Sequence, residues 1–275
     1  MAAYTTEALI LRARDFGEAD RLLTLYTLAE GKVSAKVRGA RKPKSRLSGA
    51  TLPLTQAEVM LWRGRSSIET LTQAVSKEGF GPLREDLWRL AQGNLVAELV
   101  DLTTEERVPS PETYVALLQT MTLVAYGEAP EVAAYSFGLR LLRDAGLLSQ
   151  LGRCASCGRE LPEERATEGE AAVWPRAAEG PLCRACAAAA GVAGLSLGPD
   201  VLRVLSRLLD AGPRALAALR LSAQLEAQIR AVLWDALTGH LERRPRSLEF
   251  VDIVAATRAA RAVGGGGQDG TVRAP

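Results

Sequence analysis

Four cysteines in two closely spaced pairs are the residues of this chain best suited to chemistry. They are the only cysteines among its 275 residues, and they stand at Cys154, Cys157, Cys183 and Cys186. Each Cys-x-x-Cys pair can present two thiolates to one ion, and two such pairs build the tetrahedral sulfur cage that Zn²⁺ prefers. The 25 residues between the pairs, 158–182, are more than a zinc ribbon usually has, which is consistent with an inserted finger.

Two disulfides, unliganded thiols and an iron–sulfur cluster are the alternatives for these cysteines. The N-terminal sequence MAAYTTEALILRAR lacks the basic and apolar regions of a signal peptide, so we expect a cytoplasmic protein in which disulfides are disfavoured. A catalytic zinc keeps one coordination position open, whereas four thiolates close the shell. We therefore predict one structural Zn²⁺ that holds a loop too small to fold alone.

A basic segment near the N-terminus is the second candidate site. Its seven cations are Lys32, Lys36, Arg38, Arg41, Lys42, Lys44 and Arg46, with no acidic residue between them. The formal charge is 13 − 8 = +5 over residues 1–80 and 21 − 24 = −3 over residues 81–275, which the net charge of +2 conceals. A charge run is often plain solvated surface, but a concentrated basic strip on a mildly acidic chain is typical of proteins that bind the phosphate backbone of nucleic acid.

Polar and apolar residues alternate through the first half of this segment. A strand over 32–38 would direct Val33, Ala35 and Val37 into a core. The open face would then carry Lys32, Ser34, Lys36 and Arg38. We predict a rigid charged face that continues into a mobile loop over 39–49, and contacts to the phosphate backbone that do not read base sequence.

The sequence lacks the usual sets of catalytic residues. His240 is the only histidine, on the expected last turn of a helix, and H-E-x-x-H does not occur. Residues 39–45 superficially resemble a phosphate loop, but no glycine stands directly before Lys44. Pro43 also removes a backbone N–H donor that such a loop needs. We predict that the protein is not an enzyme; a zinc-dependent nuclease or hydrolase is the alternative from another class.

Hydrophobic periodicity predicts strands first and helices afterwards. The expected strands are 7–14, 21–28, 32–38, 56–62 and 66–75. Five short strands with glycine-bearing turns suit a small closed barrel of the OB type, with an SH3-like barrel as the competitor. Tyr26 and Trp62 fall on these strands and could stack nucleobases, although such aromatic residues more often belong to a core.

Beyond residue 81 the apolar residues recur at helical spacing. One expected helix begins at Pro82, a second spans 110–126, and a third ends near Gly146. Two more are expected over 201–209 and 225–237. Their apolar faces need partners, which favours a helical bundle. The predicted fold class is therefore α+β and multi-domain. Its parts are an OB-type β-barrel over 1–80, an α-helical bundle domain over 81–150 and 191–262, an inserted four-cysteine zinc finger over 151–190, and a disordered Gly-rich tail over 263–275.

Several segments match a known family. They are 8–12 (ALILR), 15–24 (DFGEADRLLT), 31–35 (GKVSA), 38–47 (RGARKPKSRL), 139–142 (LRLL), 146–147 (GL) and 151–158 (LGRCASCG). Together they resemble the bacterial recombination mediator family RecO over about residues 5–250. The Gly-rich tail departs from the family, and we assign it no role.

The resemblance implies an OB-fold, a helical domain and, in many members, a four-cysteine zinc finger. It also implies a DNA repair protein of homologous recombination that binds single- and double-stranded DNA nonspecifically, anneals complementary strands and helps load RecA onto strands coated with single-strand-binding protein. The implied partners are RecR and single-strand-binding protein, with RecA indirectly, in the cytoplasm at the nucleoid and without a membrane. From charge and fold alone, an RNA-binding ribosome- or translation-associated OB-fold factor fits equally well.

Overall fold

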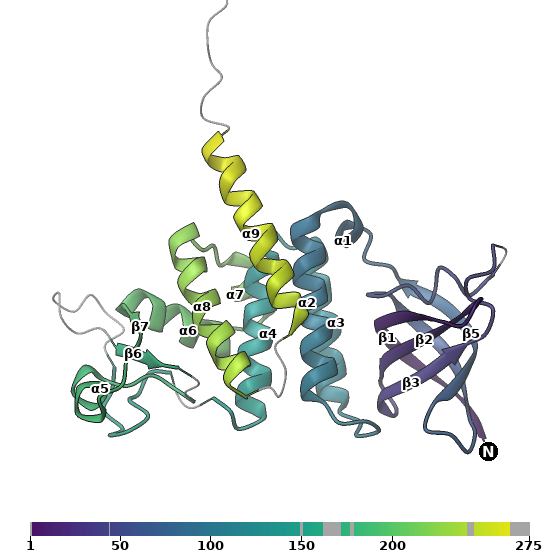
Figure 1. Cartoon of the computed structure of the whole chain (residues 1–275), viewed down its shortest axis with the longest axis horizontal. Coiled ribbons are helices and arrows are strands. Elements are labelled where there is room, and N and C mark those ends of the chain that lie inside the picture. The colour runs from purple at the N-terminus through teal and green to yellow at the C-terminus, as the bar shows by residue number, and fades with distance from the viewer. Residues whose placement is uncertain are drawn as a thin grey trace, which may run out of the picture.

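Five strands at the N-terminus close into a barrel (Figure 1). The computed structural model describes residues 2–43, 45–148, 151–161, 172–176, 179–240 and 245–264. The strands are β1 (Ala2–Phe16), β2 (Asp20–Thr27), β3 (Gly31–Val37), β4 (Gln56–Arg63) and β5 (Glu69–Glu78), in the order β1-β2-β3-β5-β4. Neighbours are antiparallel except for the short parallel pair β3–β5. This five-stranded barrel is the predicted OB type.

The barrel core follows from period-two patterning. Val33, Ala35 and Val37 are each at most 1% exposed, as the alternation predicts. β1 is longer than expected because its first half pairs with β4 and its second half with β2, across a bulge between Ile10 and Arg12. β5 begins three residues later than the predicted 66–75, since Ser66 Oγ accepts a hydrogen bond from Ile68 N at 3.1 Å and forms a local turn.

A helical domain follows the barrel directly. Its helices are α1 (Pro82–Glu85), α2 (Leu87–Thr103), α3 (Pro111–Tyr126), α4 (Pro130–Asp144), α6 (Pro199–Asp210), α7 (Pro213–Ala218), α8 (Ala223–His240) and α9 (Arg246–Gly264). Proline occupies the first turn of five of them, where a missing N–H costs no hydrogen bond. α2 lies at the centre and packs against α3, α4 and α9. None of the described helices has the length and apolar character needed to cross a membrane.

The single helix expected to begin at Pro82 is in fact two. Asp86 has extended φ/ψ of −121° and 119°, and its side chain accepts hydrogen bonds from Trp88 N and Arg89 N at 2.7 and 3.0 Å. An aspartate in this geometry caps a helix N-terminus. The i, i+4 spacing of Leu83 and Leu87 therefore spans a helix boundary.

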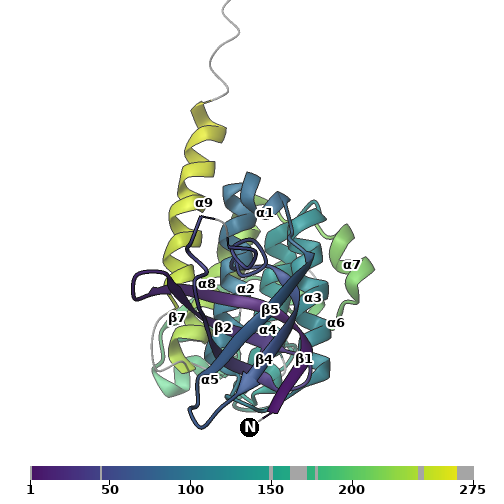
Figure 2. The same cartoon turned by 90° about the vertical axis from the view of Figure 1, so that its right-hand side faces the viewer.

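One apolar core joins the barrel to the helices. Leu9, Leu11 and Tyr26 of the barrel are buried in the same cluster as the central residues of α2 and α4. Tyr26 is 1% exposed, so its suggested role in base stacking is wrong. Figure 2, turned by 90° from Figure 1, shows the barrel strands crossing in front of the helical domain, with α9 projecting above the other helices.

A small unit carrying the cysteines lies at the end of the molecule opposite the barrel (Figure 1). It contains β6 (Ala172–Pro175), α5 (Arg184–Ala190) and β7 (Gly194–Leu197), and β6 pairs antiparallel with β7. Trp174 of β6 is fully buried and donates from Nε1 to Asp235 Oδ2 of α8 at 3.1 Å. This contact fastens the unit to the helices. The tail was predicted over 263–275, but α9 continues through its first two residues, Val263 and Gly264. Residues 265–275 lie outside the described residues.

Candidate metal centre and nucleic-acid interface

The four cysteines converge on one point. All four Sγ atoms lie within 4.8 Å of one another, and Cys157 Sγ is 3.9 Å from Cys183 Sγ. Tetrahedral zinc with Zn–S bonds of about 2.3 Å would place its sulfur ligands about 3.8 Å apart. The thiols are free rather than paired as disulfides. The predicted cluster of Cys154, Cys157, Cys183 and Cys186 could therefore hold a metal ion, and its donor set and spacing fit zinc.

Local hydrogen bonds shift the pKa values of two of these thiols in opposite directions. Burial opposes ionisation of Cys154, but backbone N–H groups of Cys183, Cys157 and Ser156 donate to its sulfur and lower its pKa to about 6. Cys183 N lies 3.3 Å from that sulfur. In contrast, the side-chain hydrogen bond with Cys183 raises the pKa of Cys186 to about 12. Metal ligation requires thiolates, so a bound cation would supply the charge that reverses this second shift.

The basic segment divides into a packed part and an exposed part. Lys32 belongs to the packed part: its Nζ donates to Asp101 O at 2.5 Å and lies 3.8 Å from Asp101 Oδ1 of α2. Its side chain is only 12% exposed. The prediction that Lys32 lies on an open face is therefore wrong, because the helical domain covers the start of β3. The neighbouring Ser34 faces Glu106 of the same domain.

Two further predicted residues are paired but remain partly exposed. Lys36 Nζ lies 2.9 Å from Asp20 Oδ2, and Arg41 Nε lies 3.3 Å from Asp15 Oδ2. The hydrogen bond from Lys36, followed by one from Gly39 N, holds the pKa of Asp20 below its usual range. The charge of each cation is partly offset, so these residues are weaker candidates for phosphate contacts than an unpaired cation.

Arg38, Lys42 and Arg46 form the exposed part. Each is solvent-exposed, and none forms an ion pair with another described residue. Lys44 lies outside the described residues. Arg14 is a further exposed, unpaired cation among the described residues, and the sequence reasoning missed it. The strand register is the signal that would have revealed Arg14. Leu22 of β2 pairs with both Arg14 of β1 and Lys36 of β3, so the two cations lie on the same face of the sheet.

The loop after β3 is held against the β1–β2 turn. Arg41 N donates to Ala19 O at 3.0 Å, and its guanidinium donates to Gly17 O and Glu18 O at 3.4 and 3.2 Å. Gly39 N donates to Asp20 Oδ1 at 2.9 Å. The described residues of the predicted loop 39–49 form hydrogen-bonded turns, and these bonds place Arg38 and Lys42 beside the β1–β2 turn.

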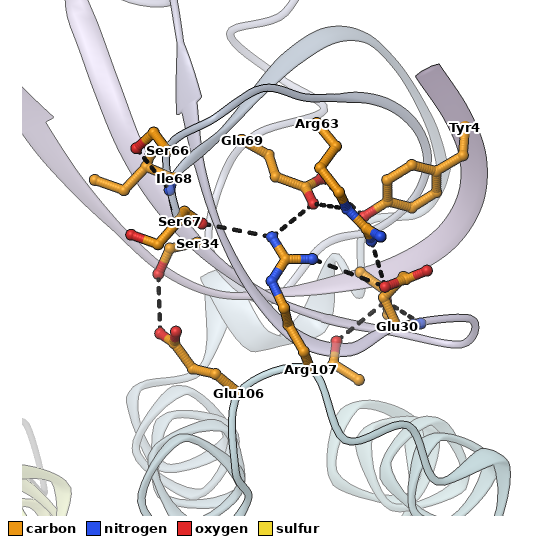
Figure 3. Close-up of polar contacts among 12 residues, drawn as sticks. Tyr4, Glu30, Ser34, Arg63, Ser66, Ser67, Ile68, Glu69, Glu106 and Arg107 are labelled. Carbon is orange, nitrogen blue, oxygen red and sulfur yellow. Dashed lines mark hydrogen bonds and ion pairs between the residues drawn. The ribbon is translucent and has the colours of Figure 1, made fainter. Parts of the chain in front are cut away.

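A buried ionic cluster joins the barrel to the helical domain (Figure 3). The Glu69 side chain is fully buried and accepts hydrogen bonds from Tyr4 Oη at 2.8 Å, Arg63 Nε at 3.0 Å and Arg107 Nη2 at 2.7 Å. Burial opposes ionisation of Glu69, but the donors led by Arg107 hold its pKa below the usual range. Glu30 Oε2 accepts a hydrogen bond from the Nη2 atom of Arg63. This cluster fixes the barrel relative to α2 and α3 and was not evident from the sequence.

Comparison with known proteins bears on the whole chain. The family model "Recombination protein O N terminal" matches residues 1–80, and "Recombination protein O C terminal" matches residues 84–249. This chain belongs to the recombination protein O family. The boundary between the two matches falls where the barrel meets the first helices.

Curated relatives extend the match over most of the chain. The DNA repair protein RecO of Symbiobacterium thermophilum is 36% identical over 262 residues, which cover 94% of this chain and all of the relative. RecO of Anaeromyxobacter sp. (strain K) is 38% identical over 247 residues, which cover 88% of this chain and 93% of the relative. RecO of Roseiflexus sp. (strain RS-1) is 37% identical over 253 residues, which cover 91% of this chain and 86% of the relative. The resemblance seen in the sequence is confirmed, and membership of the recombination protein O family supports a role in DNA repair and recombination.

Proposed function

We propose that this protein binds the sugar–phosphate backbone of single- and double-stranded DNA at the end of its barrel, anneals complementary strands, and helps load RecA onto strands coated with single-strand-binding protein. The observation that supports this most directly is that Arg14, Arg38, Lys42 and Arg46 of the barrel domain are exposed and have no ion-pair partner among the described residues. Cations that lack a carboxylate partner can neutralise phosphates without first breaking an ion pair.

Strand annealing follows from the same electrostatics. Two complementary strands repel each other through their phosphates, and a surface that neutralises both lowers that repulsion. The proposal needs no bond-making step, so it treats the chain as a mediator and not as an enzyme. RecR and single-strand-binding protein are the proposed direct partners, and RecA is an indirect one, because it is loaded onto the DNA strand. We place these interactions at the nucleoid, in the cytoplasm. No observation favours the RNA-binding alternative.

The cysteine cluster takes a structural part in the proposal. We propose that it holds one Zn²⁺, which would stabilise the unit at the opposite end of the molecule from the barrel (Figure 1). A zinc ion bound by four thiolates has no free position for substrate. Its removal should therefore lower stability first and affect DNA affinity only secondarily.

Charge reversal on the barrel tests the proposal. Arg38→Glu with Lys42→Glu should reduce affinity for single- and double-stranded oligonucleotides alike, because both share the phosphate backbone. The matched control is Arg207→Glu with Arg214→Glu, two exposed cations on α6 and α7 that change the net charge equally. If three to five cations contact phosphate, log K for a single strand should fall with log salt at a slope of about −2 to −4.

Annealing of complementary oligonucleotides, bare and coated with single-strand-binding protein, should be lost in the barrel double variant and retained in the control. A salt slope near zero, or equal affinity of the barrel variant and wild type, would overturn the proposal. Competition between single-stranded DNA and structured RNA of equal length distinguishes the DNA function from the RNA-binding alternative.

A further inference from the structure

An exposed phenylalanine stands at the tip of the β1–β2 hairpin. Phe16 is the last residue of β1 and is 46% exposed. Lys36 Nζ lies 4.8 Å from the centroid of its ring and also 2.9 Å from Asp20 Oδ2. Because Asp20 is the register partner of Phe16 on β2, the ring and the ammonium are held by the same short stretch of hairpin. An ammonium over one face of an aromatic ring is a favourable cation–π contact.

Further cations lie on the strand and the loop next to this ring. Arg14 lies two residues earlier on the same face of β1, since side chains two apart along a strand point the same way. Arg38 and Lys42 belong to the loop that Arg41 and Gly39 fasten to the turn beside Phe16. An exposed apolar residue alone is ordinary on a protein surface. Here it sits within the group of cations that the proposed function assigns to phosphates.

We propose that Phe16 stacks against a nucleobase of single-stranded DNA whose phosphates contact the neighbouring cations. The inference rests on the proposed function and deepens it, because it adds a base contact to the phosphate contacts. In a single strand the bases are unpaired, so their faces are available to an aromatic ring, and such stacking tolerates any base. With the ammonium of Lys36 on one face of the ring, the base occupies the other.

The other aromatic residues suggested by the sequence do not share this setting. Tyr26 is buried beneath the helical domain. Trp62 is 41% exposed, but it pairs with Ala3 at the opposite end of β1 from Phe16. It therefore lies away from the exposed cations of the hairpin and loop and serves as a control of similar exposure.

The test compares Phe16→Leu with wild type on two single strands of equal length and charge, one with normal bases and one with an abasic tract. Loss of one stacked base should weaken binding of the normal strand by about fivefold or more. Binding of the abasic strand should be unchanged, because its phosphates are intact. Phe16→Trp should retain the affinity of wild type, and its new indole should be quenched by the normal strand.

Each outcome separates the two proposals. If Phe16→Leu weakens both strands equally, or neither, the stacking inference fails while phosphate binding stands. If wild type binds neither strand, the proposed function itself fails. Trp62→Leu should match wild type on both strands; a selective loss of the normal strand in that variant alone would move the base contact to the other end of β1 and overturn the assignment to Phe16.

Discussion

Arg107 and Glu69 form a 2.7 Å hydrogen-bonded ion pair between the loop after α2 and the first residue of β5. The carboxylate is fully buried, and Arg63 also donates to it at 3.0 Å. The barrel and the helical domain are thus linked through a charge that has no access to water (Figure 3).

Glu69→Gln should destabilise the protein strongly. The amide keeps the shape of the carboxylate but removes the buried one of the two anions that Arg63 and Arg107 share, the other being Glu30. Breaking a buried ion pair costs up to about 3–5 kcal/mol. Urea unfolding followed by circular dichroism measures the loss. The matched control is Glu58→Gln, a half-exposed carboxylate 3.9 Å from Lys77, where an exposed pair contributes about 0–1 kcal/mol. Equal stability of the two variants would refute a buried ionic link.

The same carboxylate predicts how stability depends on pH. The folded pKa of Glu69 is lower than the ordinary value of 4.5. A depressed carboxyl pKa contributes stability that is fully present above 4.5 and is lost as the pH falls through the folded pKa. Wild type should therefore lose stability below pH 4.5 more steeply than Glu69→Gln. Unfolding midpoints measured between about pH 3 and pH 7 check this, and parallel curves for the two proteins would contradict it.

Lys32 and Lys42 should separate stability from DNA binding. Lys32→Gln removes a largely buried contact with Asp101, so it should lower the free energy of unfolding by about 1–3 kcal/mol while the salt dependence of DNA binding stays unchanged. Lys42→Gln removes an exposed charge, so it should leave stability intact and reduce the salt slope by about 0.7. Fluorescence anisotropy at several salt concentrations measures the slopes. If Lys32→Gln instead reduced the salt slope and Lys42→Gln did not, the DNA would contact the start of β3.

Cys154→Ser and Cys183→Ser should reduce both metal content and stability. Each removes one of four sulfur ligands, and since losing a contact to a ligand alone costs about 10–100-fold in metal affinity, losing the ligand should cost more than about 100-fold. Metal analysis of the purified variants and thermal unfolding with and without chelator test this. Arg159→Ala keeps all four thiols, changes an exposed side chain of the same unit, and serves as the control. Stoichiometric zinc in both cysteine variants would contradict the assignment.

Gly31→Ala should disrupt the contact between β3 and the loop before α3. Gly31 has φ of +66°, and a Cβ there would lie 2.3 Å from Val108 O. Gly17 shares a φ of +60° but meets open space, so Gly17→Ala isolates the conformational strain of about 1–2 kcal/mol. We expect a larger loss of unfolding free energy for Gly31→Ala than for Gly17→Ala. Equal losses would mean that the loop yields without cost.

Local patterning predicted the barrel and most helices because both depend on periodicity along the chain. The alternation of Val33, Ala35 and Val37 is sufficient to orient β3, and Pro111 marks the start of the helix expected over 110–126. The cysteine cluster was predictable for a similar reason, since two short motifs each preorganise a pair of thiols. In contrast, the capping of α2 by Asp86 depends on one side chain and left no trace in the apolar spacing.

Contacts between domains could not be predicted in this way. Lys32 and Arg38 look equivalent in the sequence, yet one is covered by Asp101 of α2 and the other is exposed. The pairing of Glu69 with Arg107 joins residues 38 positions apart whose neighbours give no signal. Phe16 was overlooked because exposure of an aromatic residue at a hairpin tip is a property of the folded surface. The charge run itself showed only that cations are present, not which of them remain available.

The apolar core shared by β1, β2 and the helices makes the parts of this protein poor candidates for separate expression. A fragment ending near residue 80 would leave Leu9, Leu11 and Tyr26 facing water, together with the buried carboxylate of Glu69 stripped of Arg107. Such a fragment should self-associate or remain only loosely folded. Heating the intact chain should accordingly melt the barrel and the helical domain in one cooperative transition.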